Sequence, residues 1–215
     1  LFLSPLIWNM RAAAFLRWDL ELPRSSGWQD FIKRFRIASN APVYVTESNS
    51  WGASEMFDGF DHITLYDAHH DSGYDDEVVK RLFDTGALGC GEWMVGHALR
   101  GVKLEMHYPT WKKDAFDYEP KPQVPVNRSF DTGKHDRRVY DAVYVCRSGA
   151  WTPTWEDENF NKFWSSIPGS IVDPKLFDDG FAIKPRGFDM DEVTEMAIAD
   201  KAAMEELASL NEVAK

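Results

Sequence analysis

Short apolar segments alternate with helical patterns along this chain, and that alternation constrains its fold more than any other feature. The segments PVYVTE at residues 42–47, HITLYD at 62–67 and AVYVC at 142–146 are short and rich in β-branched and aromatic residues, as buried strands are. Residues 102–108 alternate apolar and polar side chains and predict a further strand. Strands that alternate with helices imply an α/β fold with a mainly parallel sheet.

The helices are predicted by start and stop signals and by apolar faces. Ser25 and Ser26 precede an amphipathic pattern, and a later segment with acidic residues first and basic residues last is followed by the helix stop Gly86. The predicted helices cover residues 25–35, 75–83, 91–100 and 155–167. Residues 109–123 are rich in Pro, Lys and Asp and predict a long excursion over the surface, where function often resides.

The length of 215 residues suffices for one sizeable core. We expect an α/β domain over residues 1–188 and a C-terminal amphipathic helix over residues 189–215. This helix has an apolar stripe formed by Val193, Met196, Ala203, Leu207 and Leu210. The stripe is expected to pack either on the domain or on a partner, which includes a second copy of the chain.

Charge and cysteine usage exclude several classes of partner. A net charge of −11 repels phosphate groups, which argues against nucleic acid or an anionic membrane as the main partner. The N-terminal run LFLSPLIWNMRAAAFL is interrupted by Arg11, so we predict neither a signal peptide nor a membrane span. Cys90 and Cys146 match no metal or redox spacing and favour a reduced, cytoplasmic protein. A small-molecule substrate or another protein remains as the partner.

Two carboxylates and two imidazoles follow the predicted strand at 62–67, in the stretch YDAHHDSGY. In an extended segment Asp67, His69 and Asp71 would project to one side, and Ala68 and His70 to the other. Ligands bind where the strands of a parallel sheet end, and these side chains suit Mn²⁺, Zn²⁺ or Fe²⁺. The sequence therefore predicts a metal site, with an acidic turn that caps the next helix as the alternative.

The same stretch resembles a known family. Asp67-Ala-His-His-Asp71 after a buried strand is similar to the metal-binding signature Asp-Ala-His-x-Asp of the arginase/ureohydrolase superfamily, which is related to the histone deacetylases. DAHHD, CGEW, HYPTW and VCRSGAWTPTW together resemble uncharacterised arginase-like proteins that also occur in bacteriophage genomes. The resemblance covers roughly residues 42–165. It implies a three-layer α/β/α fold in which Asp67 bridges two Mn²⁺ or Zn²⁺ ions, His69 binds one ion and Asp71 binds the other.

The chain departs from that family at the remaining ligands. Where ureohydrolases have a histidine from an earlier loop, this chain has Asn49. Their Ser-x-Asp-x-Asp stretch is matched by Ser129-Phe-Asp131-Thr-Gly133, which lacks the second carboxylate, and the preceding Pro125 disfavours a central strand. The alternative match is AVYVC, followed by Arg147. We therefore expect a site for one metal, formed by Asp67, His69 or Asp71 with Asp131 or water.

Other residues each have a functional and a structural interpretation. Glu92 is a candidate general base or a helix-capping acid. Arg147 follows a buried strand and either holds a substrate carboxylate or phosphate or pairs with a nearby acid. Cys90 is expected to be a buried small side chain rather than a nucleophile, and His97 and His107 are expected to be hydrogen-bonded core or rim residues.

Two functions follow as hypotheses. The first is a metal-dependent hydrolase of C–N bonds in a small polar substrate, with Asp67, His69, Asp71 and Asp131 as ligand candidates and Glu92 and Arg147 as catalytic candidates. The alternative is a catalytically degenerate protein of the same fold that serves in binding or assembly, for example as a phage component in the host cytoplasm or the virion.

Overall fold

The structure is a computed structural model of the chain. It describes residues 10–17, 28–53, 57–75, 77–86, 88–110, 112, 119–147 and 157–172. The predicted C-terminal helix over residues 189–215 lies outside the described residues, as do Trp151 and Trp155.

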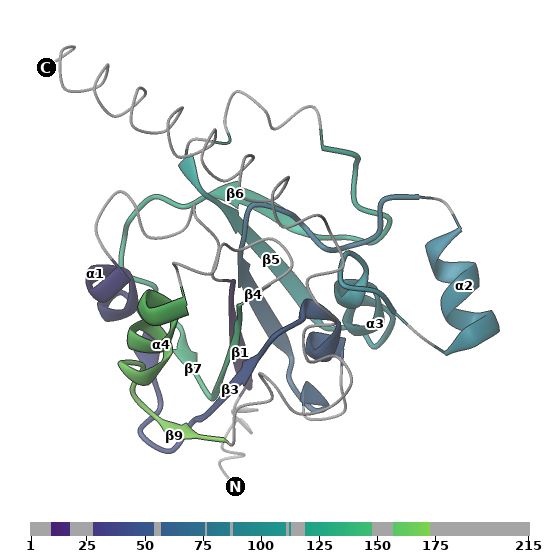
Figure 1. The fold of residues 1–215 in the computed structure, drawn as a ribbon. Helices are drawn as coiled ribbons and strands as arrows, with labels where there is room; N and C mark the ends of the chain where they lie inside the picture. The colour runs from purple at the N-terminus through teal and green to yellow at the C-terminus, as the bar shows by residue number, and fades with distance from the viewer. Residues whose placement is uncertain are drawn as a thin grey trace, which may run out of the picture.

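Seven parallel strands form one sheet in the order β6-β5-β4-β1-β8-β3-β9 (Figure 1). They are β1 (Ala12–Arg17), β3 (Pro42–Thr46), β4 (His62–Tyr66), β5 (Lys103–Tyr108), β6 (Asn127–Phe130), β8 (Ala142–Cys146) and β9 (Ser170–Ile171). The short strands β2 (Arg36–Ile37) and β7 (Val139–Tyr140) pair separately. The predicted α/β fold with a mainly parallel sheet is confirmed, and β6, which follows Pro125, lies at an edge as expected.

The central strand β1 was not predicted from the sequence. Its segment AAAFLR begins with three alanines, which have low strand propensity, yet it pairs with β4 on one side and β8 on the other. Ala14 and Leu16 face one core cluster, whereas Ala13 and Phe15 face the other. A strand covered on both faces is stabilised by its tertiary environment, which here overrides the local preference of alanine.

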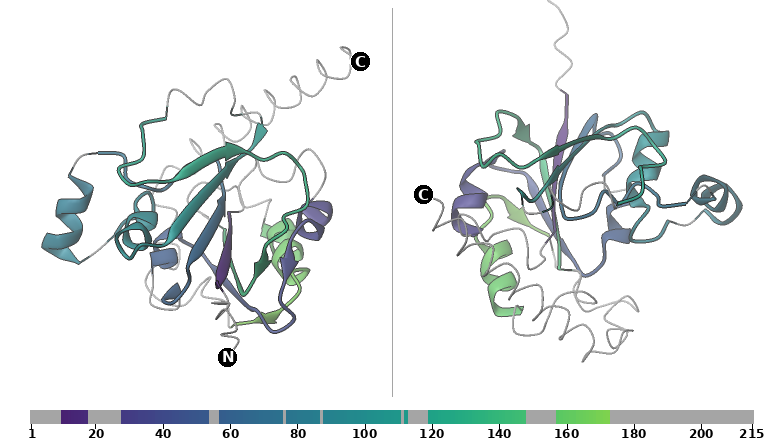
Figure 2. Two further views of the ribbon diagram at one scale, coloured as in Figure 1. Left: turned by 180° about the vertical axis from the view of Figure 1, so that it is seen from behind. Right: turned by 90° about the horizontal axis from the view of Figure 1, so that it is seen from above.

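Helices cover both faces of the sheet, so the fold has three layers. Helices α1 (Trp28–Lys33) and α4 (Asp157–Ser165) lie on one face, and α3 (Trp93–Leu99) and the 3₁₀ helix η1 (Asn49–Ala53) lie on the other (Figure 2). The first layer packs through Phe31, Phe160 and Phe163. The second packs through Trp93 and Met94. The helices predicted at 25–35, 91–100 and 155–167 are thus present in the described parts of these ranges.

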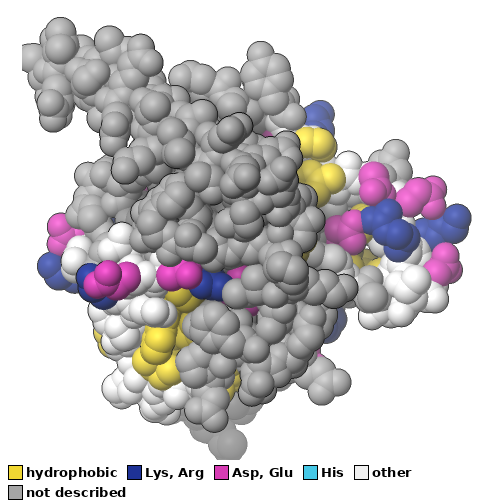
Figure 3. All heavy atoms as spheres, in the orientation of Figure 1, with side chains coloured by type: hydrophobic (Ala, Val, Ile, Leu, Met, Phe, Trp, Pro, Cys, Tyr) yellow, Lys and Arg dark blue, Asp and Glu magenta, His cyan; other side chains and the backbone are white. Residues whose placement is uncertain are grey.

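Helix α2 (Val78–Thr85) projects from the side of the molecule that carries α3 (Figure 1). It ends at Gly86, which was predicted as the helix stop. The φ of Gly86 is 68°, in the left-handed region that glycine adopts without strain. Charged side chains of both signs lie next to one another on this helix (Figure 3). Phe83 is 77% exposed on it. No helix in the described ranges has the length and apolarity needed to cross a bilayer.

The buried position of β1 makes a prediction about stability. Phe15 stacks on Trp93 with ring centroids 4.7 Å apart and also contacts Phe57 and Tyr144. Phe15→Ala should lower the free energy of unfolding by about 3–5 kcal/mol because it leaves a cavity in this aromatic cluster. The control Phe83→Ala, at an exposed site, should change it by less than about 0.5 kcal/mol. Urea unfolding followed by tryptophan fluorescence measures both, and equal effects of the two variants would contradict the placement of β1.

Candidate functional site

The carboxyl ends of β1 and β4 meet at a point where the chain direction across the sheet reverses. From β1 the chain passes through α1 toward β3, and from β4 it passes through α3 toward β5, so the two connections leave in opposite directions and on opposite faces. In open parallel sheets such a switch point leaves a crevice in which ligands bind. Asp67, the first residue after β4, lies at this edge.

Two buried carboxylates converge on one amide at this edge. The Asn49 side-chain nitrogen donates to Asp71 Oδ2 over 2.7 Å and lies 3.4 Å from Asp67 Oδ2. The Trp93 indole N–H also donates to Asp71 Oδ2, over 2.7 Å. Asp67 is fully buried, and Asp71 and Asn49 are 3% and 4% exposed. The cluster therefore joins the loop after β3, the loop after β4 and helix α3.

Asp71 has an unusual backbone conformation. Its φ of 47° is the one positive φ found at a non-glycine residue in the part of the chain that the structure describes. The Asp71 carbonyl accepts a hydrogen bond from Met94 N over 3.1 Å, and its amide contacts the Tyr74 hydroxyl at 3.3 Å. Backbone strain of this kind costs about 1–3 kcal/mol and is concentrated at functional sites. Here it turns the Asp71 carboxylate back toward Asn49.

The two histidines of the cluster do not alternate as an extended strand would place them. After Tyr66 the chain leaves the sheet and turns, with His69 N donating to Asp67 Oδ1 over 3.2 Å. His69 is exposed, and His70 is completely buried. In the described residues, no group of three or more His, Cys, Asp and Glu side chains is arranged to hold a metal ion. The structure thus brings Asp67 and Asp71 together and adds Asn49, but it does not complete the predicted ligand set with His69.

His70 instead belongs to a buried network that the sequence did not indicate. Its Nε2 donates to the Pro120 carbonyl over 2.8 Å, its Nδ1 accepts from Ser72 N over 3.0 Å, and its ring stacks on Tyr74. Burial lowers the pKa of His70, which keeps the ring neutral, as this pair of bonds requires.

Glu119 is the acid of this network. Its carboxylate accepts from Tyr108 over 2.7 Å and from His70 N over 3.0 Å, and it lies 3.4 Å from Lys112 Nζ. Burial raises the pKa of Glu119, but the hydrogen bonds from Tyr108 and the His70 amide and the charge of Lys112 outweigh it, so the pKa is lower than usual. Lys112 also donates to the Ala68 carbonyl. The segment 109–123 was expected on the surface, yet the Lys112 and Glu119 side chains are only 7% and 5% exposed, and their bonds to Ala68 and His70 fasten the segment to the loop after β4.

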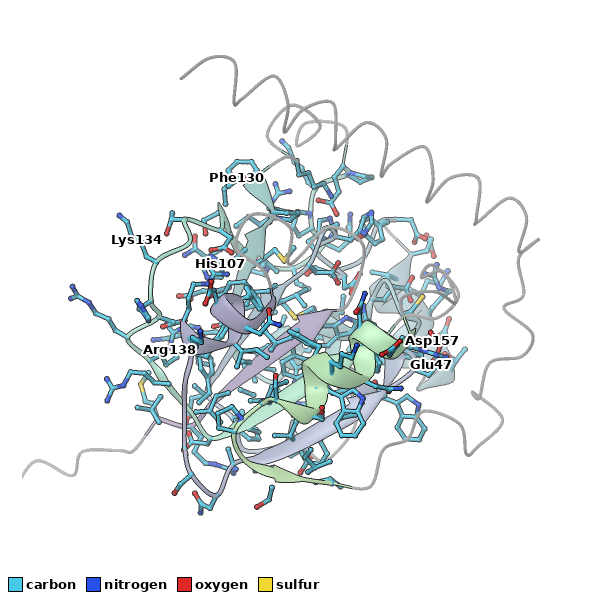
Figure 4. All side chains as sticks on the ribbon, turned by 60° about the vertical axis from the view of Figure 1, so that its left-hand side comes forward. Glu47, His107, Phe130, Lys134, Arg138 and Asp157 are labelled. Carbon is cyan, nitrogen blue, oxygen red and sulfur yellow. The ribbon has the colours of Figure 1, made fainter. Side chains whose placement is uncertain are left out.

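The remaining candidates lie apart from the carboxylate pair. Both Asp131 oxygens accept from Arg34, over 2.8 and 2.7 Å, on the face that α1 covers. Arg147 donates through Nε to Glu47 over 2.8 Å and lies 2.8 Å from Asp157, and Figure 4 shows these two acids side by side. Asp131 is therefore not a ligand candidate beside Asp67, and the ion-pair interpretation of Arg147 is the observed one.

Glu92 and Cys90, which precede α3, also differ from the roles expected from the sequence. Glu92 is the N-cap residue of α3 without a side-chain capping bond, and its carboxylate pairs with Arg81. It is engaged there rather than at Asp67. The prediction that Cys90 is buried was wrong, because this thiol is exposed. The expectation that His97 is a hydrogen-bonded core residue is confirmed.

Comparison with family models, curated proteins and solved structures finds no match for the chain.

His97 connects the two elements that carry Asn49 and Trp93. Its Nε2 donates to the Gly52 carbonyl over 2.6 Å, which ties α3 to η1, and burial lowers its pKa to about 4. In the unfolded chain His97 binds a proton near pH 6.5, whereas in the folded chain it does so only at about pH 4. The stability that His97 contributes is therefore present above about pH 6.5 and is lost as the pH falls from about 6.5 to about 4.

The loss should have a slope of up to about 1.4 kcal/mol per pH unit in the free energy of unfolding. His97→Gln keeps a donor for Gly52 but cannot titrate, so its stability should depend less on pH between about pH 6.5 and about pH 4. Chemical unfolding at a series of pH values measures the difference. Identical slopes for the wild-type protein and the variant would show that His97 does not titrate as its burial requires.

Proposed function

We propose that Asp67 and Asp71 bind one divalent cation, Mn²⁺ or Zn²⁺, and that the protein is a metal-dependent hydrolase of C–N bonds in small polar substrates, related to the arginase superfamily. One observation carries the proposal. Two buried carboxylates approach the same amide nitrogen at the carboxyl edge of a parallel sheet, beside its switch point. Carboxylates held this close repel each other when ionised, and a bound cation relieves that repulsion.

The residues fit one ion better than two. A second ion would need the histidine that Asn49 replaces and a carboxylate in place of Asp131, which is bound to Arg34. Asp71 Oδ2 accepts from the Asn49 amide and the Trp93 indole, and the Asp67 oxygens accept from His69 N and Asn49, so an ion bound here would share the carboxylates with these donors. His69 is exposed on the same loop and is the candidate for a third ligand. When bound, such an ion supplies a Lewis acid for hydrolysis.

The surrounding residues hold this pair in place. Asn49 and Trp93 orient the Asp71 carboxylate, as residues that donate to metal-binding carboxylates commonly do. The bond from His70 to the Pro120 carbonyl and the bond from Lys112 to the Ala68 carbonyl restrain the loop between Asp67 and Asp71. A small polar substrate would therefore meet a preorganised acidic site, which reduces the cost of arranging the ligands on binding.

Metal titration of two matched variants tests the proposal. In the wild-type protein, Mn²⁺ or Zn²⁺ at about 100 times its Kd should raise the free energy of unfolding by about 3 kcal/mol relative to chelator. Asp67→Asn should abolish that gain because it removes a ligand charge. Asp131→Asn, which breaks a carboxylate pair with Arg34 elsewhere, should keep it. Calorimetric titration and thermal unfolding, each with and without chelator, measure the effect.

An effect of Asp67→Asn that does not depend on metal would contradict the proposal. If Asp67→Asn loses the same stability in chelator as in metal, the carboxylate is neutralised by protein groups and the metal proposal fails. The second candidate function, a catalytically degenerate binding or assembly protein, would then stand. It is favoured by the saturation of Asp71 Oδ2 with neutral donors and by the engagement of Arg147 with Glu47 and Asp157.

A further inference from the structure

A pocket of about 360 Å³ lies on the face of the sheet that α1 covers, opposite the layer that contributes Asn49 and Trp93. Its floor is formed by β4, β5 and β6, and the segment 131–138 forms its wall. Its lining includes Tyr66, Glu105, His107, Ser129, Lys134 and Arg138. Figure 4 shows His107 and Arg138 on the side of the molecule away from the Glu47–Asp157 pair.

The sheet register aligns three of these side chains. Tyr66 on β4 pairs with His107 on β5, which pairs with Ser129 on β6. Neighbouring residues of parallel strands in register point to the same face, so the three side chains form a row across the pocket floor. The His107 ring stacks on Tyr66 with centroids 4.7 Å apart. Its orientation is thereby restricted.

His107 contacts a hydroxyl with one nitrogen and faces a carboxylate with the other. Ser129 Oγ lies 2.9 Å from His107 Nδ1, and His107 Nε2 lies 4.0 Å from Glu105 Oε2. Ser129 is exposed to the pocket, whereas His107 and Glu105 are half-buried. A serine, a histidine and an acid arranged in this order can serve as a nucleophile, as its general base and as the group that orients the base and stabilises its charged form.

The electrostatics of these groups match those roles. The His62 contact at 3.3 Å and the Arg138 bonds lower the pKa of Glu105 to about 2, so it is a carboxylate at neutral pH. Burial lowers the pKa of His107, with Glu105, Asp131 and Asp136 acting in the opposite direction and Arg138 adding to the lowering. A neutral imidazole is able to accept the serine proton.

We propose that Ser129, His107 and Glu105 form a second active site, which hydrolyses small carboxylic esters through an acyl-serine. Ser129 Oγ attacks the carbonyl carbon of the ester and its proton passes to His107 Nδ1. The C–O bond to the alcohol breaks, and the alcohol leaves with that proton. Water then attacks the acyl-serine, gives its proton to His107, and releases the carboxylic acid as Ser129 recovers its hydrogen. Glu105 is a positioning residue that stabilises the charged His107.

The pocket also restricts the substrate. Its volume accommodates a small acyl group, and the Tyr66 ring provides apolar surface beside His107. Lys134 extends outward at the rim of the pocket (Figure 4). Lys134 forms no ion pair with any described residue, so its charge is available to attract an acidic group on the ester.

Covalent labelling of the full chain in chelator tests this proposal without involving a metal. A fluorophosphonate should add once per chain, and peptide mapping by mass spectrometry should place the adduct on Ser129. Ser129→Ala should abolish the label, and His107→Gln should slow labelling by about 100-fold or more. The matched control Ser165→Ala removes an exposed helix hydroxyl that bonds to the Lys162 carbonyl, and it should leave the rate unchanged.

Hydrolysis of p-nitrophenyl acetate gives a second readout. Ser129→Ala should remove enzymatic turnover, and Glu105→Gln should lower kcat about 10-fold or more with KM within about twofold of the wild-type value, because Glu105 does not touch the substrate. Absence of an adduct, an adduct on another residue, or equal labelling of wild-type protein and His107→Gln would overturn the proposal. Because both assays run in chelator, failure of metal binding at Asp67 has no bearing on their outcome.

Discussion

The backbone ladder on either side of β1 is the constraint on which the rest of the structure depends. β1 is buried on both faces, so its peptide groups have no access to water and must be satisfied by β4 and β8. The parallel pairing brings the carboxyl ends of these strands to one edge. The loops after β3, β4 and β5 therefore meet there, and with them Asn49, Asp67 and Glu119.

Side-chain alternation along the same strands separates two polar sites. Leu65 packs in the core beneath α3, whereas Tyr66 packs on the opposite face, and the next residue, Asp67, returns to the α3 side and bonds with Asn49. On β5, His107 faces the pocket and Tyr108 reaches Glu119. A single sheet thus carries the Asp67–Asp71 carboxylate pair at the carboxyl ends of its strands and the Ser129, His107 and Glu105 side chains on one face.

The sequence predicted four of the strands of the sheet because they carry strong local signals. β3, β4, β5 and β8 were predicted within one residue of their observed bounds, since each combines β-branched or aromatic residues with turn residues at its ends. β1 was missed because Ala12, Ala13 and Ala14 carry no strand signal, and their burial follows only from the neighbouring strands.

The candidate site was predictable only in part. Asp67 and Asp71 stand out as neighbours in the sequence, but the positive φ of Asp71 and the turn at His69 depend on contacts with Trp93, Met94 and the 109–123 segment. Glu119 and Lys112 come from a stretch whose composition indicates a surface loop. Ser129 and His107 are 22 residues apart, and only the register of β5 and β6 brings them together.

Anomalous diffraction from crystals of the full chain grown with Mn²⁺ tests the central claim most directly. The account predicts one anomalous peak within coordination distance of the Asp67 and Asp71 carboxylates, about 2.0–2.5 Å from their oxygens. The same data would identify any contribution from His69. Crystals that contain Mn²⁺ elsewhere but show the Asn49 amide still bonded to both carboxylates, with no peak between them, would contradict it.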